Sequence, residues 1–587
     1  MNSDSVVIIG AGPAGLTAAY ELSKLDRHVV VVEKQDRVGG LARTEDYRGF
    51  SFDLGGHRFF TKVDEVNRLW REILGDDLLT RPRLSRIYYN RKFFYYPLRP
   101  LNAVAGLGLW KSLLILLSYI RWQIFSHRQE ETFEQWVTNR FGKRLFETFF
   151  KTYTEKVWGI PCSELRAEWA AQRIRGLSLK TALLNMFVTP ATTIKTLIEQ
   201  FQYPRLGPGM MWNAVKSQIE RRQNEVRLNC EVIAICRNGN RIESVEVCHS
   251  GQPPERIAGS AFISTMPIND LLAKLDPPPP GEILESAQKL RYRDLIVVCL
   301  IVAKRELFPD NWIYVHDPGV SVGRVQNYKN WSPDMVPDPD KSSLGLDYFC
   351  SRGDDLWNQP DNQLLQLGKR EAAAIGLADI DDIEGGCVVR VPYAYPVYDA
   401  DYRTHLNAVR AFVGGFDNLQ TIGRNGLHRY NNQDHAMMTG LLAARNLALG
   451  EKHDVWSVNT EPDYLEETVA DAAFEESLAQ IFSKLDRLSF GLAVGSVCGA
   501  LLFVATLWLT IKGGNDVGAN LQLLRNYFPG YRVTAAGSIL GFAYGFASGF
   551  IMGWSFAFLR NATMFLSLAW LQRKAQRGLL RKVFDYL

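Results

Sequence analysis

Residues 6–24, VVIIGAGPAGLTAAYELSK, constrain the fold of this chain more than any other stretch. Four apolar residues run directly into a GxGxxG turn, and an amphipathic helical pattern follows at once. Gly10 permits the tight turn, Gly12 lets the backbone approach a pyrophosphate, and Gly15 lets the helix pack closely on the strand. We therefore predict an α/β fold that begins with a Rossmann-like, dinucleotide-binding strand, turn and helix.

The predicted dinucleotide site continues where VVVVEK ends a second strand at Glu33. A carboxylate at this spacing can accept hydrogen bonds from ribose hydroxyls. The glycine pair Gly39 and Gly40, in RVGGLART, resembles the continuation found in FAD enzymes of the glutathione-reductase type. This resemblance implies FAD, and the sequence shows no second complete fingerprint for a separate NAD(P)H domain.

The alternation of strand and helix patterns predicts one catalytic domain over residues 1–459 with two insertions. A helical, aromatic insertion is expected at about 80–205, and a small β-sheet at about 222–262. Residues 460–487 form an acidic stretch that we interpret as a helical connector, and residues 488–587 form a separate apolar and basic region.

Two long stretches near the C-terminus carry no charge: 24 residues from Leu488 to Ile511 and 27 from Val533 to Leu559. At about 1.5 Å per helical residue each exceeds the ~30 Å hydrocarbon layer. Glycine recurs at every fourth position in both, a pattern that lets helices approach closely in lipid. We predict a transmembrane helical hairpin. The glycines form two ladders, which could also join copies of the chain into a homo-oligomer. The ladders consist of Gly491, Gly495, Gly499, Gly537, Gly541, Gly545, Gly549 and Gly553.

Two further stretches carry the marks of helices that lie on a membrane surface. The segment from Met564 reads as a basic amphipathic helix, and LWKSLLILLSYIRWQIF from Leu109 is either a second such helix or a core helix. Basic residues after the second span place both ends of the hairpin inside. We expect the inner, cytoplasmic membrane, with the catalytic domain on the cytoplasmic side.

The net charge of +4 is spread along the chain, which argues against a nucleic-acid partner. The eight cysteines form no CxxC pair, so neither a disulfide framework nor a metal site is predicted.

Five motifs follow one another in the order found in UDP-galactopyranose mutases, over about residues 5–450: DLGGHRFF, YTEKVWGIPCSEL, VGRVQNYKNW, YAYPVYD and IGRNGLHRYNNQD. The resemblance implies an isomerase that interconverts pyranose and furanose sugars. It implies that N5 of reduced FAD attacks the anomeric carbon and displaces a phosphate leaving group, without net oxidation.

The same resemblance implies the roles of individual residues. Arg173, Arg324 and Arg424 are expected to converge on one pocket, where cations stabilise the leaving diphosphate. His57 would lie beside the flavin and act with these arginines in catalysis. The expected substrate-binding residues are Tyr153, Trp158, Tyr395, Tyr430, Asn432 and Arg99, and Arg424 and Asp434 are expected to join His57, the glycines and Glu33 around the cofactor.

One part of the mutase pattern is missing: between Leu177 and Gly207 the nucleoside-gripping loop is replaced by a longer, more apolar stretch. Together with the predicted hairpin, this favours a polyprenyl-phosphate-linked sugar as substrate. A UDP-sugar remains an alternative. So do an FAD-dependent oxidase or desaturase of an apolar membrane substrate, and a flavoprotein subunit without activity of its own. The convergent arginines argue against a hydrocarbon substrate.

Overall fold

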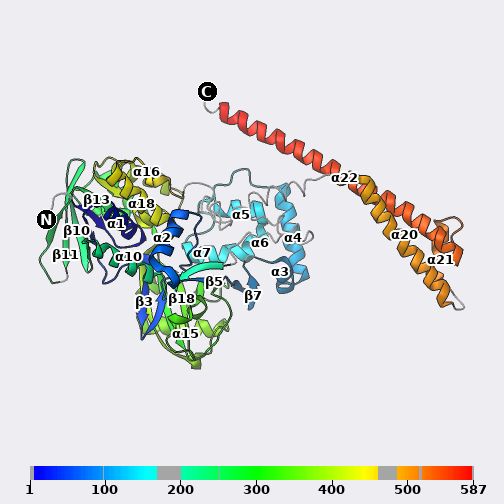
Figure 1. Cartoon of the computed structure of the whole chain (residues 1–587), viewed down its shortest axis with the longest axis horizontal. Helices are drawn as coiled ribbons and strands as arrows, with labels where there is room; N and C mark the ends of the chain where they lie inside the picture. Colours follow the sequence, from blue (N-terminus) through cyan, green and yellow to red (C-terminus); the bar gives the residue numbers. More distant parts are fainter. Residues whose placement is uncertain are drawn as a thin grey trace. The chain divides into compact units, whose positions relative to one another are not determined.

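The computed structural model describes residues 5–96, 98–167, 200–249, 251–459, 485–513 and 518–584. The chain divides into two compact units, Met1–Thr468 and Val469–Leu587, and each is described by itself. Figure 1 shows both units with their helices and strands labelled.

A five-stranded parallel sheet forms the centre of the first unit, in the order β20-β13-β1-β2-β9. Its two central strands are short apolar runs that are buried on both faces, as expected for a parallel sheet covered on both sides. This confirms the predicted Rossmann-like fold, although the strands come from distant parts of the chain: β1 Val6–Ile9, β2 Val29–Val32, β9 Glu225–Arg227, β13 Ala261–Ser264 and β20 Leu419–Thr421.

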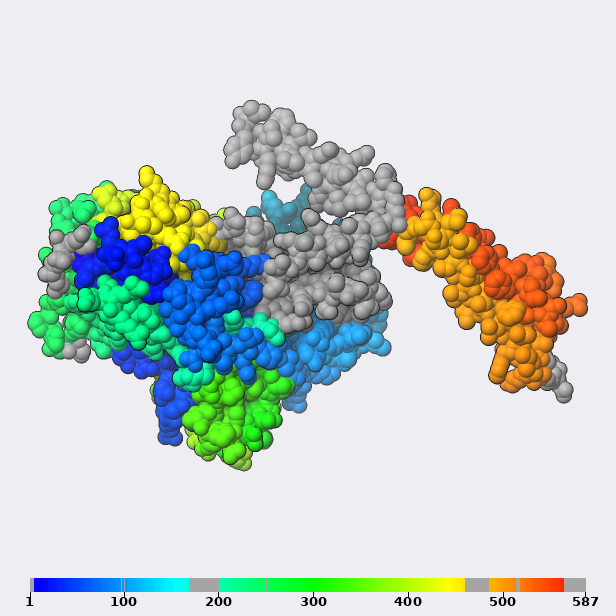
Figure 2. Space-filling view, viewed as in Figure 1, coloured from blue at the N-terminus to red at the C-terminus, as the bar shows by residue number. Residues whose placement is uncertain are grey.

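Three helices cover one face of this sheet: α1 Pro13–Lys24, α10 Gly209–Arg221 and α18 Gln433–Leu449. Helices α1 and α18 cross closely, since a Cβ at Gly440 would lie 2.4 Å from the carbonyl oxygen of Ala14. Distant parts of the chain therefore meet in this unit. Figure 2 shows this at the surface, where blue atoms from the N-terminal part lie beside yellow atoms from beyond residue 400.

A small mixed sheet covers the other face, in the order β12-β11-β10-β14, with β10 and β14 parallel and the other pairs antiparallel. The expected small sheet at about 222–262 differs from it at both ends, because β9 joins the main sheet and β14 lies beyond residue 262. The strands are β10 Cys230–Asn238, β11 Arg241–His249, β12 Glu255–Ala258 and β14 Leu275–Asp276.

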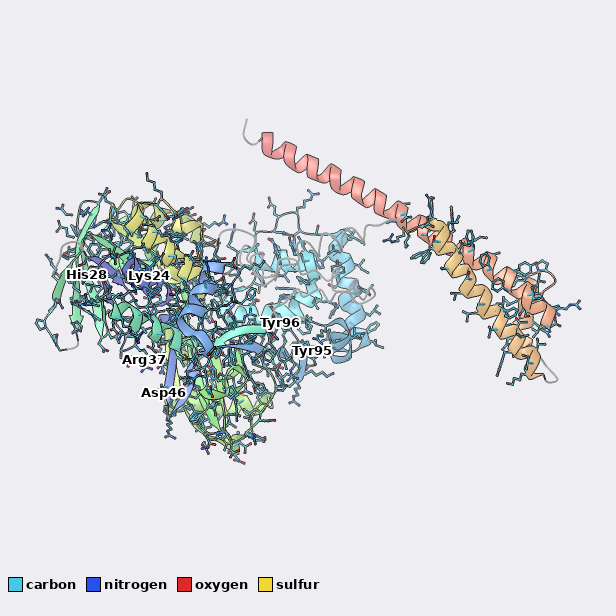
Figure 3. The ribbon with its side chains drawn as sticks, in the orientation of Figure 1. Lys24, His28, Arg37, Asp46, Tyr95 and Tyr96 are labelled. Atoms are coloured by element: carbon cyan, nitrogen blue, oxygen red, sulfur yellow. The ribbon has the colours of Figure 1, made fainter. Side chains whose placement is uncertain are left out.

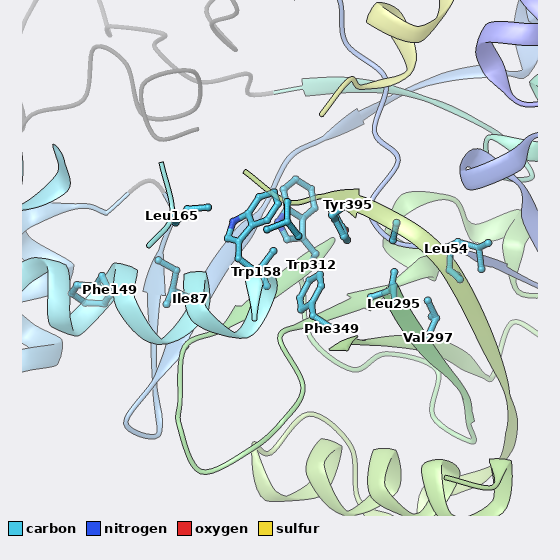
Figure 4. Close-up of a cluster of buried hydrophobic side chains, with 14 of the residues drawn as sticks. Leu54, Ile87, Phe149, Trp158, Leu165, Leu295, Val297, Trp312, Phe349 and Tyr395 are labelled. Carbon is cyan, nitrogen blue, oxygen red and sulfur yellow. The ribbon is translucent and has the colours of Figure 1, made fainter. Parts of the chain in front are cut away.

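A seven-stranded sheet forms the second half of the catalytic unit, in the order β19-β15-β18-β17-β16-β6-β7. Helix α15, Asp361–Ala374, covers one face, and a cluster rich in aromatic side chains fills the other (Figure 4). The strands are β6 Ser85–Tyr89, β7 Lys92–Tyr95, β15 Tyr292–Val302, β16 Trp312–Val315, β17 Arg324–Asn327, β18 Ser342–Cys350 and β19 Ile383–Pro396.

The expected helical insertion contains five described helices: α3 Pro100–Leu107, α4 Leu109–Ile124, α5 Phe133–Phe141, α6 Lys143–Phe146 and α7 Thr152–Trp158. Helix α5 begins at a capping box, in which the Thr132 side chain accepts from the Gln135 amide. The remaining elements of this unit include β3 Thr44–Tyr47 paired with β4 Phe50–Asp53, β5 Leu78–Pro82 paired with β8 Gln200–Pro204, α2 Asp64–Leu74, α11 Ile268–Ala273, α12 Gly281–Gln288, α13 Tyr328–Trp331, α14 Asp355–Asn358, α16 Tyr402–Val413 and α17 Gly423–Gly426.

The second unit is a pair of long helices, α20 Arg487–Lys512 and α22 Ala535–Phe584, joined through the short α21 Ala519–Gln522. Residues 487–512 and 535–563 are long and apolar enough to cross a membrane. The glycine ladders lie where the helices touch, since a Cβ at Gly495 would lie 2.8 Å from the carbonyl oxygen of Phe546. Helix α22 continues without a break through the basic segment that follows the second span.

Candidate active site

One cavity of about 430 Å³ connects the glycine turn after β1 with the arginines of the seven-stranded sheet. Its lining contains most of the predicted cofactor residues and many of the predicted substrate residues. These are Gly10, Gly12, Glu33, Gly40, His57, Arg324, Tyr395, Arg424, Tyr430, Asn432 and Asp434.

The GxGxxG turn has the geometry that its glycines predict. Gly10 has φ of +100°, and a Cβ there would lie 2.1 Å from Oγ1 of Thr265. A Cβ at Gly15 would lie 2.0 Å from the carbonyl oxygen of Gly10. Neither position can accept a side chain, so the glycines allow α1 to pack closely on β1. The start of α1 then faces the cavity.

The second glycine pair packs against the first. The Gly39 amide donates to the carbonyl of Ala11 over 2.8 Å, and a Cβ at Gly40 would lie 3.1 Å from Cα of Gly12. The N-cap of α1 is Gly12, which supplies no side chain to cap the helix. The first-turn amides can therefore receive a pyrophosphate.

The Glu33 carboxylate lies at the end of β2 and lines the cavity. It accepts hydrogen bonds from the amides of Ala11, at 2.8 Å, and Gln35, at 3.0 Å. These bonds fix the carboxylate beside the turn, where it can still accept from ribose hydroxyls. The turn, the uncapped helix start and this carboxylate fit the pyrophosphate and ribose of FAD.

A second helix start, that of α18, faces the same cavity. Asn432, expected to bind substrate, is the N-cap of this helix and forms a capping box with His435. Asp434 is buried, and one of its carboxylate oxygens lies 3.2 Å from Nδ1 of His435. Both predicted residues therefore also define the start of the helix.

Arg324, at the start of β17, forms an ion pair with the fully buried Asp347 of β18, with Nε donating to Oδ2 over 2.6 Å. Burial raises the pKa of the Asp347 carboxyl, while this carboxylate holds the pKa of Arg324 well above its usual value against the opposing effect of burial. A Cβ at Gly55 would lie 3.0 Å from Nη2 of Arg324. Glycine in DLGGHRFF thus leaves room for the guanidinium.

Arg424, in α17, lines the same cavity. Its Nε donates to the carbonyl of Asn431 and its Nη1 to that of Ala394, both over 2.8 Å. The guanidinium also lies over the ring of Tyr430, 4.7 Å from the centroid. Among the residues that the structure describes, no carboxylate pairs with it, so its charge faces the cavity.

Aromatic side chains form the wall beside these arginines. The edge of Trp158 meets the rings of Tyr395 and Tyr430, with centroids 6.2 and 6.1 Å away. Tyr153 lies one layer further back, stacked on His316 and edge-on to Tyr314, which lines the cavity. Trp158 and Tyr153 support the wall from behind and do not line the cavity themselves.

His57 follows the glycine pair of DLGGHRFF, and its Nε2 lies 3.0 Å from the carbonyl oxygen of Leu54. Burial, reinforced by the positive charges of Arg424 and Arg324, lowers the pKa of His57 to about 4. The imidazole is therefore neutral at physiological pH and does not add to the positive charge of the arginines.

Besides Tyr153 and Trp158, a third predicted substrate residue does not line the cavity. Arg99 is exposed and lies outside the lining, because its guanidinium packs 4.4 Å over the ring of Tyr95. Arg173 lies outside the described residues. The expected convergence is therefore observed for Arg324 and Arg424.

Sequence reasoning missed Arg58, which directly follows His57 and lines the cavity. Its guanidinium lies 5.6 Å from the ring of Trp312. Its position inside the DLGGHRFF motif was the available signal, but a single arginine in a motif does not indicate which way it points.

Comparisons with known proteins bear on the family and the fold of the chain. The family described as flavin containing amine oxidoreductase matches residues 13–448. A crystal structure of reduced UDP-galactopyranose mutase superposes with a TM-score of 0.68 at 23% identity, covering 79% of this chain and 99% of that one. This likeness concerns the fold.

Two curated sequences are similar over shorter lengths. A probable UDP-galactopyranose mutase of Klebsiella pneumoniae is 27% identical over 186 residues, which are 28% of this chain and 44% of that protein. A 15-cis-phytoene desaturase of Synechococcus elongatus is 23% identical over 295 residues, 45% of this chain and 58% of that protein. The chain thus matches about half the length of each of these relatives.

Proposed function

The chain belongs to the flavin containing amine oxidoreductase family, with FAD as its cofactor, and we propose that it is a flavin-dependent sugar mutase. In this proposal it interconverts the pyranose and furanose forms of a sugar that is linked to a polyprenyl phosphate.

The convergence of Arg324 and Arg424 on the FAD cavity carries this proposal. Arg324 is neutralised by Asp347, whereas Arg424 is held only by backbone carbonyls and ring faces among the described residues. A cation that is fixed without a counter-ion favours an anionic group, and a developing phosphate charge gains from it in the transition state. Neither a hydrocarbon nor a cationic amine would gain from this arrangement.

The other residues of the site have roles consistent with sugar binding. Tyr395 and Tyr430 offer ring faces to a sugar and hydroxyl groups that can donate to phosphate oxygens. Burial raises the pKa of Tyr395 to about 12, so this hydroxyl keeps its proton. Reduced FAD, when bound, supplies the nucleophile for the anomeric carbon, and the neutral His57 lies in the same cavity.

The lipid-linked part of the proposal is supported by the second unit, whose two helices are long and apolar enough to span a membrane. A polyprenyl-phosphate sugar has its tail in the bilayer and its phosphate at the surface. Holding enzyme and substrate in one membrane raises their effective concentration. A soluble nucleotide sugar offers no comparable reason for a hairpin.

The proposal is tested with the full-length protein reconstituted in liposomes. FAD is reduced with dithionite, and polyprenyl-phosphate-linked hexoses and pentoses are supplied in parallel with UDP-galactose. NMR of the released sugars should show ring contraction of a lipid-linked sugar. This conversion should require reduced FAD and should not consume the reduced flavin. Conversion of UDP-galactose alone would refute the lipid-linked substrate.

An FAD-dependent oxidase or desaturase is the second candidate, since the phytoene desaturase of Synechococcus elongatus is among the similar sequences. In the same liposomes this function would appear as consumption of oxygen or quinone, with a product two hydrogens lighter. Such a product, with no change of ring size in any sugar, would overturn the mutase proposal.

A further inference from the structure

Helix α4 carries its apolar face on the outside of the catalytic unit. None of its 16 residues is buried. Leu113, Leu117 and Ile120 are 45%, 53% and 46% exposed and lie on one side of the helix with Leu116 and Ile124. Soluble proteins usually turn such a stripe towards the core and seldom expose a large contiguous apolar patch.

The opposite side of α4 is attached to the catalytic unit by close backbone approach and polar contacts. A Cβ at Gly142, between α5 and α6, would lie 2.8 Å from Cα of Tyr119. The Ser118 hydroxyl accepts from the Arg144 amide at 3.3 Å, and Gln123 donates to the Asn139 carbonyl at 2.9 Å. The helix is therefore held with its apolar side outward, which answers the question left open by its sequence: it is not a core helix.

The charges and aromatic residues around α4 fit a membrane surface. Residues 96–129 contain four basic side chains and neither aspartate nor glutamate. Lys111 and Arg121 are exposed on the helix, and Trp110 is 70% exposed at its start. Indole rings and basic residues beside an apolar face are typical of helices that lie in the interface of an anionic leaflet.

Helix α3 precedes α4 and is bent from it by 119° at Gly108. The two helices together are apolar enough for a broken span or for an element that enters a leaflet and returns. Leu101 in α3 and Leu109 at the start of α4 are also exposed, at 74% and 80%.

We infer that α3 and α4 form a monotopic docking element, which inserts the apolar face of α4 into the surface of an anionic lipid bilayer. This contact is separate from the hairpin of the second unit. It does not depend on the reaction proposed above, because it follows from exposure, charge and shape within the catalytic unit.

The docking element starts beside the candidate active site. Tyr96, after β7, meets the ring of Tyr314 edge-on at 5.2 Å, and Tyr314 lines the cavity. A Cβ at Gly106 of α3 would lie 2.3 Å from the ring of Phe94 in β7, so the helix is fixed closely to this strand. Figure 3 shows Tyr95 and Tyr96 on the side of the unit where α3 and α4 lie. Docking would bring the Tyr314 side of the cavity to the leaflet.

A photo-labelling experiment on the full-length protein tests this inference. The liposomes contain a phospholipid with a diazirine in its acyl chain. They are prepared without anionic lipid and with about 30% phosphatidylglycerol, which gives the leaflet a negative surface potential. After irradiation, mass spectrometry of peptides should find label in residues 101–125 as well as in the hairpin. Label in 101–125 should increase with phosphatidylglycerol, and label in the hairpin should not.

Two variants separate the apolar from the electrostatic contribution. The triple variant Leu113→Glu, Leu117→Glu, Ile120→Glu should lose label in 101–125 by about tenfold, because interfacial binding scales with buried apolar area. The double variant Lys111→Glu, Arg121→Glu should lose the dependence on phosphatidylglycerol. Ile380→Glu, at a 50% exposed position in another part of the unit, is the matched control and should change neither.

Label confined to the hairpin in the wild-type protein would overturn the inference. The inference would also be overturned if residues 101–125 were not labelled by lipid but were cross-linked to a second copy of the chain. In that case α4 would be a dimer contact. Bound FAD, measured by absorbance, reports that each variant has folded.

Discussion

The ring of Tyr430 stacks on the ring of Tyr395, with centroids 5.6 Å apart and planes inclined by 13°. Arg424 lies against the faces of both, 4.7 and 5.7 Å from their centroids. The end of β19 and the loop between α17 and α18, which carry Tyr395 and Tyr430 at positions 35 residues apart, thus hold one guanidinium at the cavity. The stacked pair fixes the direction of the cation and leaves its charge without a carboxylate among the described residues.

Replacing Arg424 by methionine should weaken binding of a polyprenyl phosphate by about 10- to 100-fold, because a hydrogen-bonded contact with a charged group contributes about 1.5–3 kcal/mol. Binding is measured through the change in flavin absorbance. Arg410→Met is the control, since Arg410 pairs with Asp454 and does not line the cavity. Equal weakening in both variants would contradict the role of Arg424.

The buried pair of Arg324 and Asp347 should be sensitive to removal of one partner. Asp347→Asn leaves the guanidinium without its counter-ion, and breaking a buried pair costs about 3–5 kcal/mol. The melting temperature of the purified protein should fall clearly. The double variant Arg324→Gln, Asp347→Asn should recover part of the loss, and a double variant less stable than Asp347→Asn would contradict the pairing.

The Rossmann-like turn could be predicted from the sequence because its geometry depends on few local residues. The carbonyl of Gly10 leaves no space for a Cβ at Gly15, so a glycine at this position of the sequence indicates that helix and strand pack closely. The continuation to Gly39 and Gly40 was predicted from a resemblance to FAD enzymes. In the structure a Cβ at Gly40 would lie 3.1 Å from Cα of Gly12, and one at Gly39 would lie 3.0 Å from Cα of Arg43.

The parts that were not predicted depend on contacts between distant segments. The three-residue β9 pairs with β2, and nothing in Glu225–Arg227 states whether it joins the large or the small sheet. Arg99 was expected near the substrate, but a neighbouring ring, Tyr95, holds it at the surface. A motif identifies which residue types are present, whereas their direction follows from packing that only the folded chain shows.

Gly15→Ala should abolish binding of FAD, because the added Cβ would lie 2.0 Å from a backbone oxygen that cannot move without displacing β1 or α1. The purified variant should lack the flavin absorbance band. Gly385→Ala is a matched control in β19, since a Cβ there would meet nothing within 4 Å. A variant Gly15→Ala with full flavin content would contradict the close packing in the turn.

The stability of the catalytic unit should depend on the protonation of Asp53. Burial raises the pKa of this carboxyl to about 7, against the hydrogen bonds donated by the hydroxyls of Tyr203 and Thr44. The folded state thus binds more protons than the unfolded state between about pH 4 and pH 7, and stability falls as pH rises through this window. A shift of about three units corresponds to at most about 4 kcal/mol.

Asp53→Asn removes this titration. The melting temperature of the wild-type protein, measured relative to that of Asp53→Asn, should therefore fall between pH 5 and pH 7.5, where the upper limit lies just above the folded-state pKa of about 7. A difference between the two proteins that stays constant over this range would show that Asp53 is already ionised in the folded chain at pH 5.

The glycine ladders should control how closely the helices of the hairpin pack. A Cβ at Gly495 would lie 2.8 Å from the carbonyl oxygen of Phe546, and one at Gly545 would lie 2.9 Å from that of Cys498. The variant Gly495→Leu, Gly545→Leu should separate the helices and expose Cys498, whose sulfur lies 3.0 Å from the position of a Cβ at Gly549. Alkylation of Cys498 by a membrane-permeant maleimide should become faster, because small residues at such interfaces permit the close approach that shields it. Val497→Leu, at a 59% exposed position of the same helix, should leave the rate unchanged. If both variants react at the wild-type rate, the ladders do not hold the two helices together.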